Sequence, residues 1–218
     1  MAQTIYADRQ EAAKTLATAI KMELRGKSLE RPLVLAIPRG GVVIGREVAN
    51  ALGGDLDIVV PRKIGAEFQP EFALGAVMHD GTLFLNEDSV RATGASETYI
   101  EEEKARQIAE AERRLKAYRG GRPEPAISGR TVIVVDDGVA TGATMVVALR
   151  WVRSKGPKTL IAATPVAPPS TLAELKAEAD IVVCPHAPRP FYAIGAFYGK
   201  FDQVTDEEVK EILDERSS

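Results

Sequence analysis

Residues 132–144 read VIVVDDGVATGAT, and this stretch decides the fold class. Its first four residues are β-branched and apolar, which indicates a strand buried on both faces, as in a parallel sheet. Asp136 and Asp137 follow directly, and small residues then lead into the apolar helical run MVVALRWV (145–152). A buried strand needs no carboxylates at its end. The stretch therefore predicts a strand, a ligand-binding loop and a helix.

The small residues of this loop suit a phosphate. They let backbone N–H groups converge, and the start of the following helix adds a partial positive charge. The hydroxyls of Thr141 and Thr144 can add further donors. The predicted phosphate-binding residues are Gly138, Val139, Ala140, Thr141, Gly142, Ala143 and Thr144.

The two acids suit a different part of the same ligand. Carboxylates accept hydrogen bonds, so Asp136 and Asp137 fit a pair of ribose hydroxyls, or a Mg2+ ion held through water. A phosphate site beside a diol site describes a ribose 5-phosphate. The alternative is structural, with Asp137-Gly138 as a turn and TGAT (141–144) as a helix cap. Neither a Walker P-loop nor a dinucleotide fingerprint is present.

The rest of the chain alternates apolar strand patterns with helical patterns, which predicts an α/β fold with a mostly parallel central sheet flanked by helices. The expected helices cover about 8–24, 42–54 and 170–179, and the expected strands 33–38, 56–61, 158–166 and 180–185. The middle of the chain does not follow this alternation of strands and helices. Residues 62–74 look like a loop, the segments 75–79 and 82–86 flank a hairpin turn at Asp80-Gly81, and a long polar helix covers about 96–119.

Composition narrows the function classes. The chain has 218 residues, enough for one well-cored domain, and a net charge of −3 gives no reason to expect nucleic-acid binding. No apolar run approaches the roughly 20 residues of a membrane span, and the first residues lack the pattern of a signal peptide. The single cysteine, Cys184, excludes an intrachain disulfide. We therefore expect a cytoplasmic protein with no membrane contact.

Two other predicted strand ends carry residues suited to anions. In open α/β sheets, ligands bind beyond the carboxyl ends of the strands. The sequence PRGG (38–41) offers an arginine fork and glycines that permit close backbone approach, and Arg62-Lys63 follows another strand. The alternative is structural: PRGG is then a plain turn between strand and helix, and Arg62 and Lys63 are solvated bases.

The motif VIVVDDGVATGAT resembles the phosphoribosyl-pyrophosphate (PRPP) signature of the type I phosphoribosyltransferases, and PRGG looks like their pyrophosphate loop. With the long middle segment and the tail PFYAIGAFY (190–198), the chain most resembles a bacterial branch with an undefined acceptor. The resemblance implies a Mg2+-dependent pentosyltransferase of nucleoside metabolism, with a homodimer as a family expectation. It would move 5-phosphoribosyl from PRPP to a nitrogen acceptor and release pyrophosphate. It also implies one domain over 1–218. Its core would cover about 30–62 and 128–185, its flexible loop, hairpin and long helix about 63–125, and its C-terminal hood about 186–218.

The resemblance also assigns roles to residues. Asp136 and Asp137 would hold the ribose hydroxyls and influence Mg2+, and residues 140–144 would cradle the 5-phosphate. Arg39, Gly40 and Gly41 would bind pyrophosphate in a loop with a strained or cis peptide at Pro38–Arg39. Arg62 and Lys63 would contact the leaving pyrophosphate, followed by a mobile loop. Asp136, Asp137, Arg62 and Lys63 are thus the expected catalytic residues.

The acceptor is less well specified. Purine-salvage members carry an acid where this sequence has Ala140, and a lysine in the region that reads TPVAPP (164–169) here. Both departures argue against 6-oxopurine salvage. The candidates for acceptor binding are Val166, His186, Phe191 and Tyr192, with simple packing as the alternative for each. Two other functions stay open: a regulator that binds PRPP without turning it over, and an unrelated α/β enzyme that binds a phosphosugar.

Overall fold

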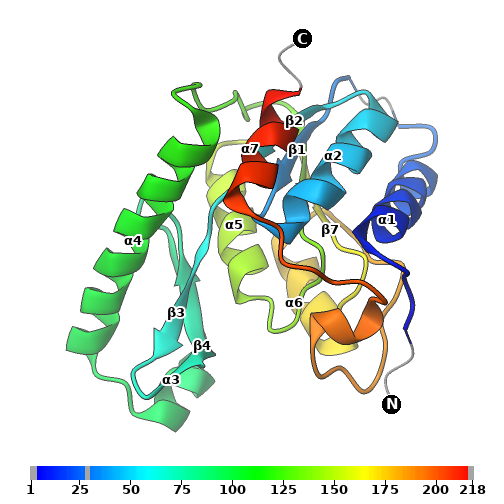
Figure 1. Ribbon diagram of the computed structural model, residues 1–218. Coiled ribbons are helices and arrows are strands. Elements are labelled where there is room, and N and C mark those ends of the chain that lie inside the picture. The colour runs from blue at the N-terminus through cyan, green and yellow to red at the C-terminus, as the bar shows by residue number, and fades with distance from the viewer. Residues whose placement is uncertain (1–3, 28–29, 216–218) are drawn as a thin grey trace.

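A five-stranded parallel sheet forms the centre of the protein, in the order β2-β1-β6-β7-β8 (Figure 1). The structure, a computed structural model, describes residues 4–27 and 30–215. The strands are β1 (Leu33–Ala36), β2 (Asp55–Ile58), β6 (Thr131–Val135), β7 (Thr159–Ala163) and β8 (Ile181–Val183). The predicted α/β fold is confirmed, although β1, β2, β7 and β8 are shorter than the strands expected from the sequence.

Helices cover both faces of this sheet (Figure 1). The strand period of two sends alternate residues to opposite faces. Ile133 and Val135 share a core cluster with α1, α2 and α7, whereas Val132 and Val134 share one with α5 and α6. The bounds are α1 (Arg9–Glu23), α2 (Gly40–Leu52), α5 (Ala143–Ser154), α6 (Pro169–Glu178) and α7 (Asp206–Asp214). None of the helices in the described part of the chain has the length and apolar character of a membrane span.

The middle of the chain forms a second, antiparallel sheet that stands beside the core with the long helix α4 (Figure 1). Its elements are β3 (Arg62–Ala66), β4 (Gln69–Val77), β5 (Leu83–Leu85), α3 (Glu87–Thr93) and α4 (Glu97–Arg119). Its apolar side packs against Ile100 of α4. The predicted hairpin is confirmed: β4 pairs with β5, and Gly81 has a φ of 87° in the turn between them.

The expectation of a loop over 62–74 is wrong. These residues contribute all of β3 and the first six of the nine residues of β4, and the two strands pair in an irregular register around Gly65. A Cβ at Gly65 would lie 2.4 Å from the carbonyl oxygen of Pro70, so glycine permits this close pairing. The exposed first half of β4 carries no apolar alternation, and for that reason the strand pattern was missing from the sequence.

The two ends of the described chain pair with each other, and residues 4–8 and 186–205 together are called the hood below. The segment after β8 contains the short 3-10 helix η1 (Ile194–Phe197) and leads to α7. The N-terminal segment pairs with it, because Tyr6 N–H donates to Phe197 O at 3.0 Å and Gly199 N–H donates to Tyr6 O at 2.8 Å. The hood therefore places the start of α1 beside residues near position 200.

Candidate active site

The candidate site lies where the chain connections reverse direction across the sheet. From β1 the chain continues to β2 on one side, whereas β6 is followed by β7 and β8 on the other. Because β1 and β6 are neighbours, the loops that leave their carboxyl ends start side by side at the switch point where open α/β sheets ordinarily bind ligands, and this place is called the crevice below. PRGG (38–41) follows β1, and Asp136-Asp137 follows β6. The sheet order thus brings two of the three predicted anion-binding strand ends together.

Glycines bring these two loops into contact. A Cβ at Gly40 would lie 1.8 Å from Asp137 Oδ2, which no side chain permits. A Cβ at Gly41 would lie 3.0 Å from Asp136 Cα. The two glycines form the first turn of α2, which begins two residues earlier than the sequence predicted. The start of α2 therefore faces the two acids directly.

The predicted phosphate loop ends in an uncapped helix. Gly142 is the N-cap of α5, has a φ of 85°, and provides no side-chain cap. Among the described residues, no acceptor bonds the backbone N–H groups of residues 140–144. Two hydrogen bonds hold the loop itself against the segment after β7 and the start of α6. Val139 N–H donates to Val166 O at 3.0 Å, and the Thr171 hydroxyl donates to Ala140 O at 2.6 Å. A rigid loop with unpaired N–H groups at a helix N-terminus is suited to bind a phosphate.

The two acids form a tight pair in the crevice. Asp137 N–H donates to Asp136 Oδ1 at 2.8 Å. Burial raises the pKa of Asp136 well above its ordinary value, and the charge of Asp137 raises it further. Burial also raises the pKa of Asp137, although the neighbouring Arg9 guanidinium acts against that rise. Two buried carboxylates favour the arrival of hydrogen-bond donors, such as a ribose diol, or of a cation.

Arg9 was not among the residues that the sequence indicated. Its Nε lies 2.7 Å from Asp137 Oδ2, and both side chains are 12% exposed. It stands in the first turn of α1 beside the N-cap Asp8, where an arginine is ordinarily solvated. Only the topology of the hood brings it to the crevice, so no local pattern in the sequence marks it.

Arg39 reaches the other side of the crevice. The peptide bond between Pro38 and Arg39 is cis, as the resemblance implied. Arg39 Nη1 lies 3.5 Å from Asp206 Oδ1 at the start of α7, and Asp206 also accepts a hydrogen bond from the Tyr118 hydroxyl at 2.7 Å. The arginine predicted to bind pyrophosphate therefore has a carboxylate partner within the protein.

The structure places Arg62 and Lys63 at the beginning of β3, in the second sheet. Arg62 Nε donates to Gln107 of α4 at 2.9 Å, and Lys63 Nζ lies 3.0 Å from Glu71 Oε2. Both residues line a cavity of about 570 Å³ between β3 and α4. Both partners belong to the second sheet and α4, so the two bases bond within that part of the protein.

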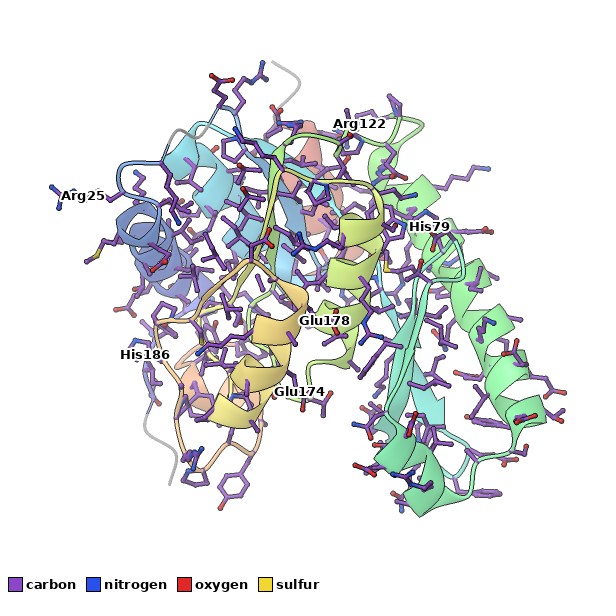
Figure 2. All side chains as sticks on the ribbon, turned by 180° about the vertical axis from the view of Figure 1, so that it is seen from behind. Arg25, His79, Arg122, Glu174, Glu178 and His186 are labelled. Carbon is purple, nitrogen blue, oxygen red and sulfur yellow. The ribbon has the colours of Figure 1, made fainter. Side chains whose placement is uncertain are left out.

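The predicted acceptor-binding residues occupy different environments. Val166 is fully buried, so its side chain supports the loop instead of facing a ligand. Phe191 stacks on Phe197 with ring centroids 4.9 Å apart. His186 lies edge-on to Tyr6 at 5.3 Å, beside the N-terminal segment and on the opposite side of the molecule from His79 (Figure 2). Tyr192 is 81% exposed.

The acid pair offers few ligands of its own to a metal ion. The described residues contain no group of three or more His, Cys, Asp or Glu side chains that could hold a metal. Asp136 and Asp137 each have one oxygen already bonded within the protein. Two partly occupied carboxylates fit a Mg2+ ion that takes most of its ligands from water and from substrate phosphates.

The comparisons with known proteins agree with this class of fold. The phosphoribosyl transferase domain model matches residues 2–194, so the chain belongs to the phosphoribosyl transferase family. The crystal structure of TT1426 from Thermus thermophilus is similar, with 47% sequence identity and a TM-score of 0.79, over 97% of this chain and 99% of that chain.

Curated relatives from Mycobacterium tuberculosis are also similar. The protein named "Putative phosphoribosyl transferase Rv0571c", from strain H37Rv, is 39% identical over 210 residues. The match covers 96% of this chain and 46% of that protein. The chain thus spans about half the length of the curated relatives it matches.

Proposed function

We propose that this protein transfers the 5-phosphoribosyl group of PRPP to a nitrogen acceptor and releases pyrophosphate. One observation carries the proposal: the uncapped start of α5, the acid pair at 136–137 and the start of α2 meet at one crevice. They would serve as a phosphate site, a diol site and a second anion site, in the order in which PRPP carries its groups.

The residues would divide the work as follows. The N–H groups of 140–144 would bind the 5-phosphate, and Asp136 and Asp137 would accept hydrogen bonds from the ribose hydroxyls. Arg39, with the first turn of α2, would bind the pyrophosphate after leaving Asp206. The acceptor nitrogen attacks C1 of the ribose while the C1–O bond to pyrophosphate breaks.

Charge stabilisation is the main requirement of this reaction. Positive charge builds on the ribose ring beside the acid pair, and negative charge builds on the leaving group beside Arg39. A bound Mg2+ would neutralise the pyrophosphate oxygens, and Asp136 and Asp137 would hold its water ligands. Arg62 and Lys63 now bond Gln107 and Glu71. They would contact the leaving pyrophosphate only after the second sheet and α4 move toward the crevice.

The acceptor proposed is a nucleobase or a related heterocycle. Tyr192 offers an exposed ring on the hood that could stack on it. His186 and Phe191 have ring partners within the protein and would need to turn to meet a ligand. A cytoplasmic location stays a prediction from the sequence, and a homodimer stays an expectation from the family resemblance.

The test is pyrophosphate release from PRPP and Mg2+ with a broad panel of nitrogen bases. Turnover with any base supports transfer.

A second candidate is a PRPP-binding regulator. Two observations favour this regulator. Ala140 stands in place of an acid, and Arg62 and Lys63 bond to residues of α4 and the second sheet. Saturable PRPP binding without turnover on the whole panel would favour the regulator and contradict the enzyme.

A further inference from the structure

We propose that Arg9 is a positioning residue of the ribose site, which holds the Asp137 carboxylate as a fixed hydrogen-bond acceptor and ties it to the hood. This inference rests on the proposed function, because it concerns how Asp137 would bind ribose. Arg9 acts through Asp137 and is not assigned a contact with the ligand.

The contact between the two side chains is short and sheltered. Arg9 Nε donates to Asp137 Oδ2 at 2.7 Å, and each side chain is 12% exposed. A charge-assisted bond of this length fixes the plane of the carboxylate. Removal of one partner from a buried ion pair leaves the other charge without compensation. Without Arg9, the Asp137 carboxylate would therefore lose both its charge partner and its orientation.

Arg9 is in turn held by the hood. Its Nη1 donates to Asp202 O at 2.7 Å, and its guanidinium lies 3.9 Å from the centroid of the Phe201 ring. Phe201 stacks on Tyr198, and the Tyr198 hydroxyl donates to the main-chain oxygen of Asp137. The contacts thus form a closed ring from Asp137 through the hood and back to Asp137. An arginine is needed because one planar group makes the ion pair, the carbonyl bond and the stacking contact together.

The ion pair also lies against the predicted pyrophosphate loop. A Cβ at Gly40 would be 2.9 Å from Arg9 Nε as well as 1.8 Å from Asp137 Oδ2. The ion pair therefore fills the space that a side chain at position 40 would need, and the start of α2 holds Asp137 from one side while Arg9 holds it from the other.

The experiment measures the binding of two ligands by the full chain with NMR titration: ribose 5-phosphate, and inorganic phosphate as a ligand without the diol. The variants are Arg9→Met, Arg9→Lys, Asp137→Asn and the double variant Arg9→Met/Asp137→Asn. Arg153→Ala is the matched control, because it removes an ion pair with Asp180 at the far end of α5 from the phosphate loop.

We expect Arg9→Met to weaken ribose 5-phosphate binding by about tenfold or more, from the cost of breaking a sheltered pair. Phosphate binding should stay within about twofold, since the phosphate loop bonds other residues. Arg9→Lys should recover part of the loss. The double variant should bind no more weakly than Asp137→Asn alone, because both changes remove the same interaction. Arg153→Ala should bind both ligands as the wild type does.

If Arg9→Met lowers the affinity for both ligands equally, Arg9 has a general structural role and the inference is overturned. Additive losses of affinity in the double variant would also overturn it, as would an unchanged affinity of Arg9→Met for ribose 5-phosphate. If Arg9→Met does not fold, the same criteria apply to Arg9→Lys. A wild type that binds no ribose 5-phosphate contradicts the proposed function as well. Binding that needs Asp137 but not Arg9 contradicts this inference alone.

Discussion

The guanidinium of Arg9 and the carboxylate of Asp137 lie 2.7 Å apart, although 128 positions separate them in the sequence. This contact joins the first helix to the loop after β6, and it explains how the hood and the acid pair form one site. The crevice is therefore defined by three segments that only the fold assembles: the start of α1, the start of α2 and the loop before α5.

The glycine at position 40 is required by the space beside Asp137. We expect Gly40→Ala to destabilise the fold by about 1–3 kcal/mol, the typical cost of an inserted methyl group that forces its neighbours to shift. Gly41→Ala should cost less, because its nearest contact is 3.0 Å instead of 1.8 Å. Urea denaturation of both variants measures the difference. Equal stability of Gly40→Ala and the wild type would show that the loop relaxes freely and that the close approach has no cost.

The Arg39–Asp206 pair should compete with pyrophosphate. The hydrogen bond from Tyr118 holds the pKa of Asp206 below its ordinary value, so the carboxylate stays charged at neutral pH. Asp206→Asn keeps an acceptor for Tyr118 but removes the charge. Pyrophosphate binding should become roughly twofold to fivefold tighter, which is the range of a part-exposed ion pair.

Asp214→Asn is the control for this effect, because Asp214 pairs with Arg122 at the other end of α7. Calorimetric titration with pyrophosphate measures both variants. An unchanged or weaker affinity of Asp206→Asn would contradict the competition.

Magnesium should act mainly through the leaving group. The described residues provide two carboxylates and no cluster of three ligands, so the ion should depend on phosphate oxygens for its site. Chelation with EDTA should therefore weaken pyrophosphate binding by about tenfold or more, and ribose 5-phosphate binding much less. Titrations of both ligands with and without Mg2+ test this. Tight Mg2+ binding by the free protein would show a protein-only metal site instead.

Tyr192 should affect the acceptor and not PRPP. Its side chain is 81% exposed on the hood, whereas Phe191 and His186 have ring partners. Tyr192→Ala should lower kcat/KM for the acceptor by roughly tenfold, the order of one lost stacking contact, and leave PRPP affinity unchanged. Steady-state kinetics with the best base from the panel measures this. An equal loss in PRPP affinity would move Tyr192 out of the acceptor site.

Local patterns predicted the parts of this protein that depend on neighbouring residues. The apolar run before Asp136 marked a buried strand, and the small residues up to Thr144 marked a loop before a helix. The Asp80-Gly81 pair marked the hairpin. In each of these cases the physical cause acts within a few residues of the signal.

Long-range packing determined the parts that the sequence did not predict. Gln69–Val77 forms one strand, but its first half is exposed and lacks apolar alternation. Arg9 enters the site only because the two ends of the described chain pair in the hood. Val166 was predicted to meet the acceptor, yet its position between β7 and α6 buries it completely. Neither strand pairing nor burial at such distances is encoded in a local pattern.

The most direct test of the central claim is a calorimetric titration of PRPP, with Mg2+, into the wild type and into the double variant Asp136→Asn/Asp137→Asn. We predict saturable binding by the wild type and a loss of about a hundredfold or more in the double variant, because two acceptors of the ribose hydroxyls become amides. Circular dichroism should show the same fold in both. A wild type that binds no PRPP, or a folded double variant that binds it as tightly as the wild type, would contradict the assignment of this crevice.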